Sequence, residues 1–107
     1  MPQNNLDLQR LVEIIDQNYQ FTEANYVALQ AGADPNVFGI HHSLLHMQKA
    51  VGTIAEQLEQ HDHDSTLDLP VITLAIKKQF VNVLKLAAHV GMTPEDLAKH
   101  VYETYGS

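Results

Sequence analysis

The chain has 107 residues, no cysteine and a formal net charge of −7 at pH 7, from 13 acidic and 6 basic side chains. This length suits a single domain, and the absence of cysteine excludes disulfides and thiolate chemistry. An acidic chain without a basic cluster along its sequence argues against binding to nucleic acid or to an anionic membrane, because both need concentrated Lys and Arg.

Targeting and membrane segments are not expected. The first ten residues, MPQNNLDLQR, lack the apolar stretch of a signal peptide, and no apolar run approaches the length of a membrane span. Together with the absence of cysteine, this composition predicts a cytoplasmic protein.

Two helices are predicted in the first third of the chain. The first covers residues 6–19 with Asn5 as its cap, and the second covers residues 23–31 with Thr22 as its cap. Gly32 follows the second helix where a left-handed residue commonly ends one.

The best helical pattern is at residues 40–60, after a loop predicted for residues 33–39 from its Asp-Pro and Gly. One apolar stripe has spacings of four and three: Ile40, Leu44, Met47, Val51, Ile54 and Leu58. A polar stripe follows two residues on: His42, His46, Lys49, Thr53, Glu56 and Gln60. Two residues are about 200° around a helix, so the two stripes lie nearly opposite each other.

Two more helices complete the chain. A polar loop over residues 61–69 precedes a helix over residues 70–90 that is apolar almost all round, which predicts a central position. Gly91 ends this helix, and Thr93 caps the last one over residues 94–105. No strand pattern is present, so we predict an all-α fold of four to five helices in one bundle.

Two segments resemble a known family. Residues 46–59, HMQKAVGTIAEQLE, resemble the first signature helix of MazG-like nucleotide pyrophosphohydrolases, roughly EEVGELAE. Residues 79–102 resemble the second signature helix and the final helix of that family, with matches at apolar and glycine positions. The resemblance covers residues 40–105. It implies a helical bundle completed by pairing of protomers, and therefore a homodimer or higher homo-oligomer.

The metal-ligand positions of the family are changed. Family members bind Mg²⁺ through carboxylates in E-E-x-x-E and E-x-x-D, and Mg²⁺ prefers such oxygen ligands. The matching positions here hold no carboxylate: Lys49, Ala50, Thr53, Gln79 and Asn82. The resemblance therefore implies the fold without pyrophosphohydrolase activity, without a bound metal and without a cofactor. We predict that the protein instead binds a nucleotide or phosphate ligand, through Lys49, Thr53, Gln79 and Asn82, or a protein partner.

Three alternatives remain open at this point. Glu56 and Glu59, three residues apart, could hold the metal of an active pyrophosphohydrolase. The GADPN segment at residues 32–36 resembles an ankyrin loop, so the chain could be a helical protein-interaction module. His42 and His46 have an i, i+4 spacing that can chelate Zn²⁺, although solvated histidines on a polar stripe explain the same pattern.

Overall fold

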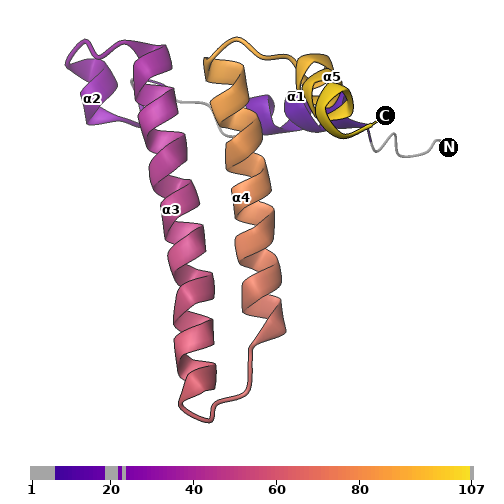
Figure 1. The fold of residues 1–107 in the computed structure, drawn as a ribbon. Helices are drawn as coiled ribbons and strands as arrows, with labels where there is room; N and C mark the ends of the chain where they lie inside the picture. Colours follow the sequence, from indigo (N-terminus) through magenta and orange to yellow (C-terminus); the bar gives the residue numbers. More distant parts are fainter. Residues whose placement is uncertain (1–6, 19–21, 23, 107) are drawn as a thin grey trace, which may run out of the picture.

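The computed structural model describes residues 7–18, 22 and 24–106. This part of the chain contains five helices and no strand, which confirms the predicted all-α fold (Figure 1). The fold is built on an antiparallel hairpin of two long helices, α3 (Pro35–Asp62) and α4 (Leu69–His89). Three shorter helices lie near the end of the hairpin that is away from its connecting loop: α1 (Leu8–Asn18), α2 (Val27–Gln30) and α5 (Pro94–Tyr105).

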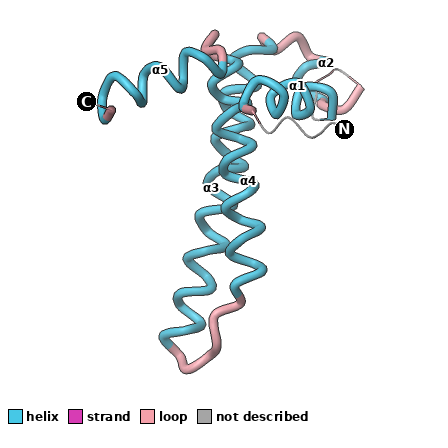
Figure 2. Tube along the Cα trace, turned by 90° about the vertical axis from the view of Figure 1, so that its right-hand side faces the viewer, coloured by secondary structure: helices cyan, strands magenta, loops and turns pink. Residues whose placement is uncertain are grey.

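The short helices are divided between the two sides of the hairpin. Viewed along the plane of α3 and α4, helices α1 and α2 lie on one side and α5 extends from the other (Figure 2). The two broad faces of the hairpin therefore have different surroundings.

Helix α3 begins at Pro35 rather than at Ile40, so the predicted loop over residues 33–39 is wrong. The side chain of Asp34 caps the helix, because its Oδ1 accepts hydrogen bonds from two backbone N–H groups of the first turn, at 2.9 and 3.0 Å. Pro35 occupies the first helical position, where its missing N–H costs nothing. The Asp-Pro pair therefore starts a helix here instead of making a turn.

Helix α4 begins at Leu69, one residue before the predicted start at Pro70. The carboxylate of Asp68 accepts a hydrogen bond from the backbone N–H of Val71 at 3.3 Å and caps the helix. At the other end, Gly91 has a φ of +86°, which is the left-handed conformation that glycine adopts most easily. The predicted role of Gly91 in ending this helix is confirmed.

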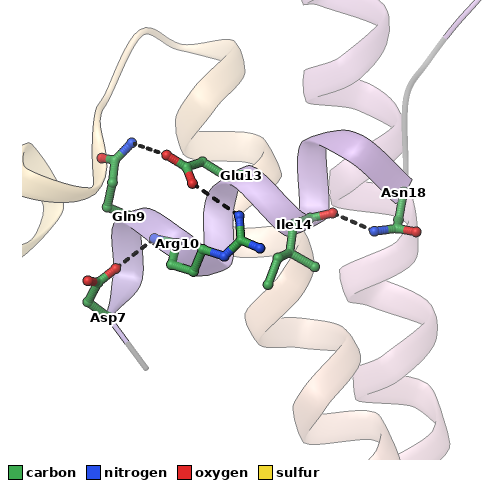
Figure 3. Close-up of polar contacts among 6 residues, drawn as sticks. All are labelled: Asp7, Gln9, Arg10, Glu13, Ile14 and Asn18. Atoms are coloured by element: carbon green, nitrogen blue, oxygen red, sulfur yellow. Dashed lines mark hydrogen bonds and ion pairs between the residues drawn. The ribbon is translucent and has the colours of Figure 1, made fainter. Parts of the chain in front are cut away.

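Helix α1 is held at both ends by its own side chains (Figure 3). The carboxylate of Asp7 accepts a hydrogen bond from the backbone N–H of Arg10 at 2.7 Å, and the Asn18 amide donates to the Ile14 carbonyl at 2.8 Å. The predicted cap, Asn5, lies outside the described residues.

Helix α2 is a single turn, shorter than the helix predicted over residues 23–31. Before it, the Thr22 carbonyl accepts hydrogen bonds from the backbone N–H groups three and four residues on, at 3.0 and 3.1 Å, which makes a separate turn. After it, Gly32 has a φ of +95°, as predicted for a residue that ends a helix. Glu23 lies outside the described residues.

Helix α5 begins with a capping box, as its sequence predicted. The Thr93 hydroxyl accepts from the backbone N–H of Asp96 at 3.0 Å, and the Asp96 carboxylate accepts from the backbone N–H of Thr93 at 2.9 Å. These hydrogen bonds lower the pKa of Asp96 below its usual value. No residue of α5 is buried, so this helix depends strongly on its local interactions.

The interface between α3 and α4 is centred on small side chains. Gly39, Ser43 and Ala50 of α3 and Ala75 of α4 are buried, which allows the two backbones to approach closely. The ring of His89 occupies the space that a side chain at residue 39 would need. Ser43 is fully buried, and its hydroxyl has no hydrogen-bond partner within the described part of the chain.

The two helices of the hairpin are long, but polar and charged residues occur along both of them. Among the helices of the described residues, none is both long and apolar enough to cross a membrane.

Candidate functional site

One side of the hairpin carries a pocket with a volume of about 610 Å³. This volume falls within the range of about 300–1,000 Å³ that is typical of small-molecule sites. Helices α3 and α4 form two walls, and the third wall comes from the end of α1 and the residues just before α2. We call it the cationic pocket, because four lysines are among its lining residues.

Helix α3 contributes His46, Lys49, Ala50 and Thr53 to the cationic pocket. These residues are spaced at three, one and three along the helix, so they share one face. The hydroxyl of Thr53 donates to the backbone carbonyl of Lys49 at 3.2 Å, so its oxygen can still accept a hydrogen bond. The polar stripe recognised in the sequence therefore borders a pocket along this part of α3.

Helix α4 contributes a matching face of five residues: Lys77, Lys78, Val81, Asn82 and Lys85. The Asn82 side chain is nearly buried, and its Nδ2 donates to the Lys78 carbonyl at 2.7 Å. This bond fixes the amide against its own helix. Its oxygen is therefore the atom that can still accept a hydrogen bond from a ligand.

The charge of this pocket is opposite to that of the whole protein. Four of the six basic residues of the chain line it, and none of its described lining residues is acidic. The sequence predicted no basic cluster, because these lysines are distributed over two helices and meet only when the hairpin forms. Four ammonium groups around one pocket disfavour a metal cation and favour an anion.

Lys85 is the most enclosed of the four lysines, with only 8% of its surface exposed. Burial lowers the pKa of its ammonium group, and the nearby carboxylate of Asp16 acts in the opposite direction. An anion bound beside Lys85 would act in the same direction as Asp16, because it stabilises the charged form. The pocket therefore gains from an anionic ligand at its most buried cation.

The third wall consists of Asn18, Asn25 and Tyr26. The Tyr26 ring packs edge-on against His42, with ring centroids 4.9 Å apart, and lies 5.0 Å from the ring of Phe38. Phe38 in turn stacks on His42 at 5.2 Å. One edge of the pocket is therefore aromatic and amide-rich, whereas the α4 wall is cationic.

His42 and His46 form a pair at this aromatic edge. Their Nε2 atoms lie 3.0 Å apart, so one nitrogen donates a proton and the other accepts it. Burial lowers the pKa of His42, and the neighbouring positive charges of His46, His41 and the lysines lower it further. For the alternative in which this pair chelates Zn²⁺, no third ligand is found, because no three His, Asp or Glu side chains converge within the described ranges.

Three of the four predicted ligand-binding residues, Lys49, Thr53 and Asn82, line the cationic pocket together. Gln79 is half-buried and does not line it. The two acids proposed as alternative metal ligands, Glu56 and Glu59, are exposed and also lie outside the pocket.

Several residues of this site were missed in the sequence. Lys77, Lys78 and Lys85 share one face of α4 by their spacing, which was a usable signal. Asn25 and Tyr26 come from a turn whose position depends on the tertiary fold, and nothing in their sequence marks them.

Known proteins provide no guide to this site. Comparison of the chain with known protein families, characterised proteins and solved structures finds no match. The function must therefore be argued from the chemistry of the pocket.

Proposed function

We propose that this chain is a MazG-like helical protein that binds a phosphate-bearing ligand, a nucleotide or a smaller organic phosphate, in the cationic pocket without hydrolysing it. The observation that carries the proposal is the set of four lysines around one pocket of about 610 Å³, with no acid among its described lining residues. Phosphate groups bind to lysine as a point charge and accept hydrogen bonds from hydroxyl and amide groups.

The walls of the pocket suit the two ends of such a ligand. The lysines of α4 and Lys49 of α3 lie where a phosphate would be neutralised. The edge formed by Tyr26 and His46 offers ring faces and edges to an apolar or aromatic group.

Magnesium-dependent hydrolysis is not supported by this geometry. A magnesium ion in a nucleotide site is held by carboxylates together with the phosphates of the substrate. Glu56 and Glu59 do not line the pocket, so the alternative of an active pyrophosphohydrolase has no observation in its favour. We expect no magnesium-dependent release of pyrophosphate from nucleoside triphosphates.

The proposal includes assembly. The resemblance to MazG-like proteins implies that protomers pair, and we propose that this chain acts as a homodimer or higher homo-oligomer. Nucleic acid and membranes are not among its proposed partners.

The ligand is tested by thermal unfolding without added magnesium. Inorganic phosphate, pyrophosphate and nucleoside mono-, di- and triphosphates are added at millimolar concentration to the wild type and to Lys49→Ala and Lys78→Ala. A ligand at 100 times its Kd stabilises by about 2.7 kcal/mol, which corresponds to a rise in Tm of roughly 10–20 °C for a domain of this size.

The matched control is Lys99→Ala. Lys99 is an exposed lysine of α5 that does not line the pocket, so its removal changes the net charge equally. We expect the shift to survive in Lys99→Ala and to shrink strongly in the two pocket variants. An equal loss in all three variants would show that only net charge matters, and no shift with any phosphate compound would reject the proposal.

A further inference from the structure

The two histidines at the edge of the cationic pocket are placed to hold a proton beside a bound ligand. His46 lines the pocket together with Lys49, whereas His42, one turn further back on α3, does not line it. The Nε2 atoms of the two histidines lie 3.0 Å apart, and their rings meet edge-to-face with centroids 4.6 Å apart. The pair therefore runs from the wall of the pocket to the aromatic residues behind it.

This histidine pair has room for one additional proton. At 3.0 Å only one proton lies between the two Nε2 atoms, because one nitrogen must offer its lone pair to the N–H of the other. The neutral pair already has this proton, and a further proton binds at Nδ1 of the donating ring. Yet another proton would place two N–H groups face to face and break the hydrogen bond. The pair therefore takes up one proton and resists the next.

The burial of the two rings indicates which of them becomes charged. The ring of His42 is half-buried, stacks on Phe38 and packs edge-on against Tyr26 from the segment before α2. Burial lowers the pKa of His42, and neighbouring positive charges lower it further. His46 is exposed at the pocket. The additional proton is therefore carried by His46, with His42 as the neutral partner that accepts its hydrogen bond.

The charged groups around His42 are positive on both helices of the hairpin. Besides His46, they are His41 and Lys49 on α3 and Lys85 on α4. Helix α1 brings the carboxylate of Asp16 to this end of the pocket, where it acts on Lys85 and His89 rather than on His42. The empty pocket therefore opposes a further positive charge, and an anion that neutralises the lysines removes this opposition.

We propose that the cationic pocket binds its ligand as an anion together with one proton, which His46 carries as an imidazolium hydrogen-bonded to His42. His46 is then a fifth cation of the site. Because the anion and the proton each favour the binding of the other, the affinity for the ligand rises as the pH falls through the range in which imidazole titrates. The inference rests on the proposed function and adds to it a further binding residue and the regulation of the site.

Inorganic sulfate is the probe that tests this coupling. Sulfate is a tetrahedral dianion whose own charge is constant between about pH 6 and pH 8, whereas phosphate groups titrate in this range. Its Kd is measured by isothermal titration calorimetry at both pH values, with EDTA present to remove metal ions. An anion beside an imidazole raises the imidazole pKa by about one unit or more. We therefore expect sulfate to bind about sixfold more tightly at pH 6 than at pH 8.

Substitutions of His46 separate its charge from a structural role. In His46→Gln the pH dependence should fall from about sixfold to less than about twofold, while His46→Lys should bind sulfate at pH 8 about as tightly as the wild type does at pH 6. The matched control is His100→Gln, which removes an exposed histidine of α5 outside the pocket. This control should keep the full pH dependence of the wild type.

The same titrations count the proton directly. Repeating them near pH 7 in buffers with different ionisation enthalpies should show an uptake of about half a proton per bound sulfate. Sulfate binding that takes up no proton, or that depends on pH equally in the wild type and in His46→Gln, would overturn the inference and leave the proposed function in place.

The absence of sulfate binding at both pH values would also overturn the inference, and the screen of phosphate compounds would then decide the proposed function by itself. If no phosphate compound binds either, the proposed function and this inference are both rejected.

Discussion

Replacing Ser43 with alanine should stabilise this protein, although the change removes a polar group from the centre of its longest interface. Ser43 is fully buried between α3 and α4, and its hydroxyl has no partner among the described residues. The hydroxyl is therefore taken from water without a compensating hydrogen bond, which is one of the costlier arrangements in a protein interior.

The size of the effect follows from three terms. Removing an unsatisfied buried hydroxyl returns about 1–3 kcal/mol. Alanine is also a better helix former than serine, by about 0.5 kcal/mol. Against these gains, a void of roughly 10 Å³ at about 24 cal/mol per Å³ costs only about 0.2 kcal/mol. The expected increase in the free energy of unfolding is about 1–3 kcal/mol, or roughly 4–24 °C in Tm.

Urea and thermal unfolding of Ser43→Ala should be compared with the wild type at one fixed protein concentration, because association shifts the apparent stability. The reciprocal control is Ala75→Ser, which adds a hydroxyl to a buried position of the facing helix and should lower Tm. If Ser43→Ala proves less stable than the wild type, the hydroxyl must make a hydrogen bond in solution, and the reasoning is refuted.

Two further predictions concern pH and the last helix. The pKa of His42 is lowered by burial and by neighbouring positive charge, so the unfolded chain binds this proton more readily. The free energy of unfolding should therefore be highest above about pH 6.5 and fall as the pH drops below it; Tm measured from pH 5.5 to 7.5 should show this slope, and His42→Gln should reduce it. Thr93→Ala removes half of the capping box at a cost of about 1 kcal/mol, and since α5 has no buried residue, we expect faster hydrogen exchange within α5 and little change in Tm; a large drop in Tm with unchanged exchange would contradict this.

Helix ends were predictable where one side chain decides them. The capping box at Thr93 and the positive φ at Gly91 both involve groups within a few residues of each other, so the sequence contains all of the necessary information. Asp-Pro at residues 34–35 was different. The same pair can start a helix or make a turn, and local chemistry does not distinguish these outcomes.

The composition of the pocket was only partly predictable for a different reason. Lys49 and Asn82 lie on different helices, and their meeting depends on how α3 and α4 align in the hairpin. Gln79 and Asn82 are three residues apart, which leaves them about 60° from each other around the helix. That difference is enough to place Asn82 in the pocket and to leave Gln79 half-buried outside it. Residue spacing alone therefore cannot decide which of two positions about 60° apart on a helix belongs to a site.

The position of α1 and α5 has a consequence for the order of folding. These helices come from opposite ends of the sequence and pack together at one end of the hairpin (Figure 1). In an unfolded chain their contact would close a loop over residues 19–93, and the entropy cost of closure grows with loop length. The hairpin needs only the turn at residues 63–68 to close, and once formed it brings the start of α3 beside the end of α4, where His89 lies 3.3 Å from Asn36. Only short connections then separate α1 from α5, so the hairpin should form early and the two ends of the chain should meet last.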